Sequence, residues 1–129
     1  MINSSFKDTA LVKQLANQLG FDHCGIAKAQ LLNEDAKRLE QWLNKDMHGS
    51  MQYMANHFDL RIDPSKLVPG AKSVITLLLN YFPDDKQHKD APKIAKYAFG
   101  KDYHEVIREK LKIFLAMIRK DIGEINGRG

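Results

Sequence analysis

The longest helical pattern of the chain runs from about residue 103 to residue 123. Apolar residues recur there at the spacing that places them on one face of an α-helix. They are Ile107, Leu111, Phe114, Ile118 and Ile122. Asp102 precedes the pattern and has a side chain that commonly caps a helix. The segment is therefore predicted to be an amphipathic helix beginning at about Tyr103.

A second helical pattern occupies the first twenty residues. Ser4 or Ser5 can cap its start, and Gly20 can end it in the left-handed conformation. Phe21 follows, at a position where helix ends often gain an apolar contact. One apolar face is formed by Leu11, Val12, Leu15, Ala16 and Leu19.

A third helix is predicted to begin after its cap, Asn33, and to end at Lys45-Asp46. Ser50 is predicted to cap a short helix after the turn at His48-Gly49. Three methionines around that turn share helical spacing, which favours core packing; a flexible surface lining a large flat ligand is the alternative. They are Met47, Met51 and Met54.

Three segments are predicted as β-strands. Residues 21–28 form a short one, and residues 94–99 form another. The most apolar run, residues 73–82, lies between Gly70 and Pro83 and is predicted to be a central strand buried on both faces. Prolines predict that residues 58–72 are irregular and that 83–93 form a surface loop.

Strands interleaved with helices predict an α/β or α+β domain of layered sheet and helices over residues 1–129. Three strands are few beside the usual five or so. We therefore expect a fragment whose sheet is completed by residues beyond 129. No internal repeat or second domain is evident.

Composition narrows the cellular setting. The chain has 129 residues and a net charge of +4, which permits contact with phosphates without requiring it. Its single cysteine, Cys24, excludes an internal disulfide framework and is expected to pack in the core. Neither a signal segment nor a membrane span is evident, so a cytoplasmic location is expected. The histidines lack helical metal-site spacing, so no protein-only metal site is expected.

Residues 96–104 contain the densest group of chemically capable side chains. They are Lys96, Tyr97, Lys101, Asp102, Tyr103 and His104. The predicted strand-to-helix turn would place a helix N-terminus and two lysines beside a phosphate- or amide-bearing ligand. His104 is expected to be half-buried. The alternative is a turn with a salt bridge between Lys101 and Asp102 and with half-buried tyrosines. Arg61, expected in a loop, is either a solvated cation or an anion-binding group.

These residues also carry a family resemblance. The sequence resembles the amino-terminal part of the epoxyqueuosine reductase family. Four stretches match it: Gly20-Phe21-Asp22 with Gly25-Ile26-Ala27, Trp42-Leu43 with His48-Gly49-Ser50-Met51-Gln52-Tyr53-Met54, Leu60-Arg61-Ile62-Asp63-Pro64-Ser65-Lys66-Leu67-Val68-Pro69-Gly70-Ala71-Lys72-Ser73-Val74-Ile75 with Asn80-Tyr81, and Lys96-Tyr97-Ala98 with Gly100-Lys101-Asp102-Tyr103-His104 and Arg108. The family commonly has arginine at positions 96 and 101 and glutamate at position 50.

The resemblance implies an enzyme that reduces the epoxide of epoxyqueuosine in the tRNA anticodon loop to give queuosine. It implies cobalamin bound to a nitroreductase-like core and two 4Fe-4S clusters, whose cysteines lie in a later ferredoxin-like module. The family's proton donor is an aspartate in a Gly-Arg-x-Phe-x-Asp-Ser segment. Gly127-Arg128-Gly129 is similar to the opening of that segment, so the aspartate is expected beyond Gly129.

By the same resemblance, one group of residues is expected to line the corrinoid or substrate pocket: Arg61, Tyr97, Asp102, Tyr103 and His104. Lys96 and Lys101 are expected to contact phosphate or corrinoid amides. An alternative is a non-catalytic corrinoid- or RNA-binding module of a related iron–sulfur protein. A domain without a site is a third possibility. Apolar surface left open by truncation could support a homodimer.

Overall fold

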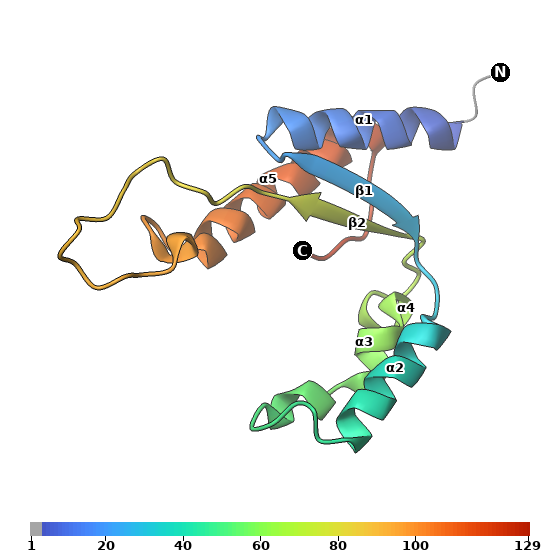
Figure 1. The fold of residues 1–129 in the computed structure, drawn as a ribbon. Coiled ribbons are helices and arrows are strands. Elements are labelled where there is room, and N and C mark those ends of the chain that lie inside the picture. The colour runs from blue at the N-terminus through green and yellow to red at the C-terminus, as the bar shows by residue number, and fades with distance from the viewer. Residues whose placement is uncertain (1–3) are drawn as a thin grey trace. The chain divides into compact units, whose positions relative to one another are not determined.

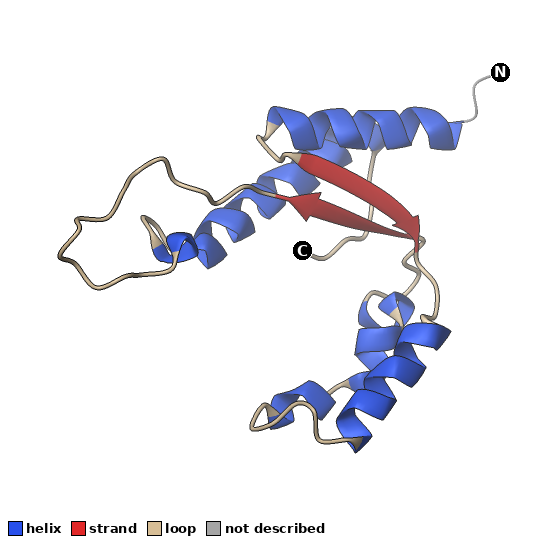
Figure 2. Cartoon of the chain, in the orientation of Figure 1, coloured by secondary structure: helices blue, strands red, loops and turns tan. Residues whose placement is uncertain are grey.

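The computed structural model describes residues 4–129 and contains both helices and strands, as predicted (Figure 1). Figure 2 shows the strands in red among helices and loops. In chain order the elements are α1 (Ser4–Gln18), β1 (His23–Lys28), α2 (Asn33–Asn44), η1 (Gln52–Ala55), α3 (Phe58–Ile62), α4 (Pro64–Leu67), β2 (Ser73–Leu78), η2 (Lys96–Ala98) and α5 (Tyr103–Ile122). The predicted cap at Ser4 or Ser5 rests on side chains outside those described.

The described chain divides into two compact units, a division that was not predicted from the sequence. One unit comprises residues 1–25, 75–127 and 129, and the other comprises residues 26–74 and 128. Each unit is described by itself below.

The core of the first unit lies between α1 and α5. The apolar faces predicted for these two helices are confirmed, because their central residues are buried against each other's element. The buried apolar residues of the unit are Val12, Leu15, Ala16, Phe21, Cys24, Phe114 and Ile118. The rings of Phe21 and Phe114 meet with their centroids 6.1 Å apart. The predicted burial of Cys24 is confirmed, and burial raises the pKa of its thiol against an opposing effect of Lys13.

The end of α1 follows the prediction closely. Gly20 has φ +79°, a left-handed conformation that glycine adopts without a Cβ penalty. The Gly20 N–H donates to the Asn17 carbonyl and the Phe21 N–H donates to the Ala16 carbonyl, which together satisfy two carbonyls at the helix end. This turn points Phe21 into the core. Lys110 of α5 adds a hydrogen bond from Nζ to the Leu19 carbonyl.

The sheet has two strands, β1 and β2, which are antiparallel. The antiparallel register follows from hydrogen bonds at both ends, where Asp22 N–H donates to Leu78 O and Ala29 N–H donates to Lys72 O, each at 2.9 Å. At Gly25 an added Cβ would lie 2.7 Å from Oγ1 of Thr76. Only glycine allows the two strands to approach this closely with that threonine in place.

Two strand predictions are wrong. Residues 94–99 form no strand, because residues 96–98 turn as the 3₁₀ helix η2. The apolar run 73–82 forms a strand only as far as Leu78, and it is not buried on both faces. Leu78, Tyr81 and Phe82 are 61%, 66% and 61% exposed. A strand is buried on both faces only when other elements pack on each face of its sheet. This sheet has only two strands, and β2 is not covered in that way.

The second unit contains α2, η1, α3 and α4. The predicted irregular segment 58–72 is wrong over α3 and α4, two short helices that pack together. Asp63 caps α4 by accepting a hydrogen bond from the Ser65 N–H at 3.0 Å. The Ser65 hydroxyl, and to a lesser extent this backbone bond, hold the pKa of Asp63 below its usual value. The cap positions predicted for Asn33 and Ser50 are wrong, because Leu32 and Met51 precede those helices without a side-chain bond.

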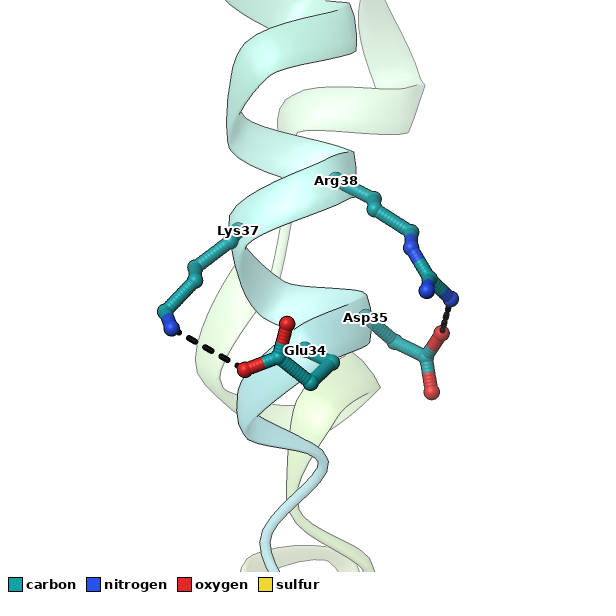
Figure 3. Close-up of polar contacts among 4 residues, drawn as sticks. All are labelled: Glu34, Asp35, Lys37 and Arg38. Atoms are coloured by element: carbon teal, nitrogen blue, oxygen red, sulfur yellow. Dashed lines mark hydrogen bonds and ion pairs between the residues drawn. The ribbon is translucent and has the colours of Figure 1, made fainter.

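Helix α2 is mostly exposed and is stabilised on its surface by neighbouring charges. Glu34 pairs with Lys37 at 3.0 Å and Asp35 pairs with Arg38 at 3.2 Å, one turn apart along the helix (Figure 3). Such exposed pairs contribute only a few tenths of a kcal/mol each, about 0.2–0.5. No helix among residues 4–129 has the length and apolar character needed to cross a membrane.

Candidate functional site

The candidate site lies in the first unit, where the turn η2 is followed by the start of α5. Asp102 occupies the N-cap position of α5, as predicted, and its Oδ1 accepts the backbone N–H of His104 at 2.9 Å. The same oxygen lies 2.8 Å from Nδ1 of the His104 ring. The backbone bond, followed by the imidazole contact, holds the pKa of Asp102 below its usual value.

This contact determines how the His104 ring is protonated. An ionised carboxylate only accepts hydrogen bonds, so Nδ1 must carry the hydrogen. In the neutral ring Nε2 then has a free lone pair, and among the described residues no group bonds to it. His104 was expected to be half-buried; instead its side chain is 62% exposed. The reason is its place in the first turn of α5, outside the apolar face that packs on α1.

This imidazole and two tyrosine rings form what we call the aromatic cluster, which consists of Tyr97, Tyr103 and His104. The Tyr103 and His104 rings stack with centroids 4.0 Å apart and an interplanar angle of 28°. Tyr97 meets Tyr103 edge-on at 6.0 Å. Tyr97 is 53% exposed and Tyr103 is 42% exposed. Both tyrosines are thus about half exposed, which also agrees with the alternative of half-buried aromatics in a turn.

The two lysines of the segment differ in their surroundings. Nζ of Lys96 lies 3.4 Å from the centroid of the Phe82 ring, a cation–π contact. Lys96 and Phe99 also line an open surface hollow of about 340 Å³ on the loop that precedes η2. Lys101 is exposed and stands at the start of α5 beside Asp102. The shared role predicted for the two lysines and the aromatic cluster stays a prediction, since the aromatic contact of Lys96 is with Phe82.

Arg61 belongs to the second unit and lies in α3, so its predicted place in a loop is wrong. Its Nε donates to the Asn56 carbonyl at 3.0 Å and its Nη2 donates to the Tyr53 carbonyl at 3.3 Å. These bonds hold the turn around η1 against α3. Arg61 therefore forms hydrogen bonds within its own unit, and among the described residues its Nη1 has no hydrogen-bond partner.

Sequence reasoning missed a buried histidine in the second unit. His48 is 5% exposed, and its Nε2 lies 3.3 Å from Oε1 of Gln52. The Trp42 ring lies beside it, with centroids 5.7 Å apart. The one available signal was the Gln four residues later, at helical spacing. The core packing predicted for Met47 and Met51 is wrong, because both are exposed.

No group of three or more potential metal ligands comes together within residues 4–129. Cys24 stands alone and buried. The chemistry available at the candidate site is therefore that of an oriented imidazole, a carboxylate, exposed aromatic rings and lysines.

Known proteins are similar to this chain in sequence and in fold. Residues 61–129 match the family described as epoxyqueuosine reductase QueG, DUF1730. An epoxyqueuosine reductase of Cyclobacterium marinum is 57% identical over 124 residues, which are 95% of this chain and 40% of that protein. The chain thus spans about two-fifths of the length of that curated relative.

Solved structures agree. A crystal structure of selenomethionine-labelled epoxyqueuosine reductase covers 94% of this chain at 25% identity, with a TM-score of 0.75, and the chain covers 33% of it. A crystal structure of epoxyqueuosine reductase with an epoxyqueuosine-modified tRNA-Tyr stem loop covers 90% of this chain at 25% identity, with a TM-score of 0.72, and the chain covers 32% of it. The predicted α+β class and the resemblance are confirmed. Because the family match extends over more than half of its residues, the chain belongs to the epoxyqueuosine reductase QueG, DUF1730 family.

Proposed function

We propose that this chain forms the amino-terminal part of an epoxyqueuosine reductase, within its cobalamin-binding catalytic domain. The full-length enzyme would reduce the epoxide of epoxyqueuosine in a tRNA anticodon loop to give queuosine, in the cytoplasm. The family membership supports the reaction class. The observation that carries the assignment of a site is the exposed aromatic cluster, whose rings are stacked and oriented although no apolar core covers them.

The aromatic cluster fits one wall of a corrinoid pocket. A corrinoid is a large flat ring edged with amide groups, and exposed aromatic faces with nearby hydrogen-bond donors suit such a surface. Tyr97, Tyr103 and His104 would face the macrocycle or the substrate base, and Asp102 would hold the histidine. Bound there, cobalamin would supply the redox chemistry, while these residues orient the ligand and limit the access of water.

Lys96 and Lys101 would contact RNA phosphate or corrinoid amides, as would Nη1 of Arg61. Lys96 is directed by the Phe82 ring, so its position is held before any ligand binds. Lysine provides a point charge without the two-pronged donor geometry of the arginine that the family commonly has at these positions.

Iron–sulfur clusters do not fit the residues of this chain. A 4Fe-4S cluster is held by cysteine thiolates, and the chain has one cysteine, which is buried. We therefore assign no cluster ligand here and expect the ligands of two such clusters elsewhere in the full-length protein. The proton-donating aspartate is likewise expected beyond Gly129.

The proposal is tested in the full-length protein with two variants of one residue. Tyr103→Ala removes the ring that stacks on His104, so cobalamin retention and conversion of an epoxyqueuosine stem-loop should both fall by about tenfold or more. Tyr103→Phe keeps the ring and removes only the hydroxyl, so it should retain both. Cobalamin is measured by absorbance of the purified protein and conversion by mass spectrometry of digested RNA. Full cobalamin and full conversion in Tyr103→Ala would refute the assignment.

A further inference from the structure

Removal of the oxygen from an epoxide to leave an alkene has a fixed proton requirement. Both C–O bonds break, a C=C bond forms, and two electrons and two protons are consumed as the oxygen leaves as water. Under the proposed function, on which this inference rests, the electrons come from the reduced metal cofactors. The expected aspartate beyond Gly129 donates one proton, and the second has no assigned source.

We propose that His104 supplies the second proton, from Nε2, to the departing oxygen, and that Asp102 is the positioning residue that presents it. The imidazolium becomes a neutral imidazole as the O–H bond forms. Its exposed edge then recovers a proton from water. The role requires a titratable group with one fixed tautomer and one free nitrogen, and His104 has both.

The fixed tautomer follows from two bonds to one oxygen. Oδ1 of Asp102 accepts the backbone N–H of His104 at 2.9 Å and faces Nδ1 of the same residue at 2.8 Å. The carboxylate thus orients the ring. Because the backbone bond also caps α5, the carboxylate cannot turn away from the ring without breaking the start of the helix.

The orientation of the ring plane is set by a separate contact. Tyr103 stacks on the imidazole at 4.0 Å, and Tyr97 supports Tyr103 edge-on at 6.0 Å. The imidazole side chain remains 62% exposed beside these rings. A ligand that covers the aromatic cluster would meet this imidazole.

The other described histidines lack this combination. His88 lies 3.7 Å from Asp90 on a loop, too far for a hydrogen bond that sets a tautomer, and both side chains are more exposed. His48 is buried, and its Nε2 is engaged with Gln52. Among the described histidines, His104 thus combines a short hydrogen bond from Nδ1 to a carboxylate with an Nε2 that has no hydrogen-bond partner. His88 provides a control, since it too has an aspartate two positions away in the sequence. Asp90 follows His88, whereas Asp102 precedes His104.

The geometric part is tested on this 129-residue chain by nitrogen-detected NMR. His104 should show hydrogen on Nδ1 and none on Nε2 in its neutral form. His88, whose Nδ1 accepts the Asp90 backbone N–H at 3.4 Å, should not show this Nδ1-protonated tautomer. Asp102→Asn keeps an oxygen for the helix cap but loses the charge, so the His104 tautomer should become mixed. A mixed tautomer in the unaltered chain would overturn the role of Asp102, whatever the enzyme does.

The chemical part is tested in the full-length protein by single-turnover conversion of an epoxyqueuosine stem-loop. His104→Gln should lower the rate about 100-fold, a usual size for a lost acid–base group. The unaltered rate should fall as pH rises through the His104 titration that NMR records, and His104→Gln should abolish that dependence. His88→Gln should change neither rate nor profile.

The outcomes separate this inference from the proposed function. If His104→Gln retains cobalamin, binds the stem-loop, and turns it over at the full rate with the same pH profile, the proton role is wrong and the proposed function stands. If the unaltered full-length protein converts no epoxyqueuosine, the proposed function fails. The tautomer measured on the 129-residue chain then remains as an independent result on Asp102 and His104.

Discussion

Asp102 illustrates how much one residue can determine. Its carboxylate caps α5 through the His104 backbone and at the same time orients the His104 ring. The cap was predictable from sequence, because aspartate before an amphipathic pattern is a helix start. The contact with the ring was not, since it depends on the side-chain rotamers of both residues in the folded chain.

Asp102 should make stability depend on acid pH. Its pKa is lowered in the folded state, so its contribution is fully present above the unfolded value, about 3.9, and is lost as pH falls through the folded value. Urea unfolding of the chain between pH 6 and the acid limit should show stability declining below about pH 4. Asp102→Asn should flatten that decline. An equally steep decline in the variant would show that other carboxylates cause it.

Lys110 is a second residue whose role only the structure reveals. Its Nζ donates to the Leu19 carbonyl at the end of α1 and lies 5.7 Å from the Phe21 ring centroid. A partly buried charged hydrogen bond at a helix C-terminus contributes about 1–3 kcal/mol, so Lys110→Ala should lower the free energy of unfolding by that amount. Lys112→Ala, at an exposed position of the same helix, should change it by less than about 0.5 kcal/mol. Chemical denaturation compares the two, and equal losses would contradict the assignment.

At the scale of elements, the helices with one strong apolar face were predictable and the strands were less so. The faces of α1 and α5 pack on each other as their periodicity indicates. Residues 94–99 contain apolar and aromatic residues suited to a strand, but no neighbouring strand pairs with them and they turn as η2. Strand preference depends on such neighbours, which a single sequence does not display.

The α1–α5 contact should dominate the stability of the first unit. Phe114 is buried against Phe21, and Phe114→Ala should cost about 3–5 kcal/mol through lost burial and the cavity it leaves. Ile113 is the matched control, because it lies one position away on the exposed side of α5. Ile113→Ala should cost less than about 1 kcal/mol. Thermal or urea unfolding measures both, and similar losses would contradict the predicted orientation of the helix.

At the scale of the whole molecule, the sequence predicted a sheet completed by residues beyond 129, because its strands are few. The sheet of the described residues has two strands where three were predicted, and its completion by residues beyond 129 stays a prediction. Residues 96–104 were selected as a candidate site from their density of functional groups, and their role stays a prediction. Their exposure was not predicted, because burial depends on what packs against the segment in three dimensions.

This open apolar surface should make the isolated chain self-associate. Leu78 ends β2, and Tyr81 and Phe82 lie in the segment that follows it; all three are exposed. They line an open hollow of about 400 Å³ together with Asp22. Light scattering at rising concentration should show a dimer or larger species, and Leu78→Ser should shift it toward monomer. A clean monomer at high concentration would rule out the homodimer expected from the sequence.

The contact between Phe21 and Phe114 also has a consequence for synthesis. The two residues are 93 positions apart, so the apolar face of α1 leaves the ribosome long before α5 can cover it. At about 5–20 residues per second, that interval lasts roughly 5–20 s. Nascent chains arrested before α5 should therefore be protease-sensitive throughout α1. During this interval the apolar face of α1 is uncovered, and its burial must wait until α5 has been synthesised.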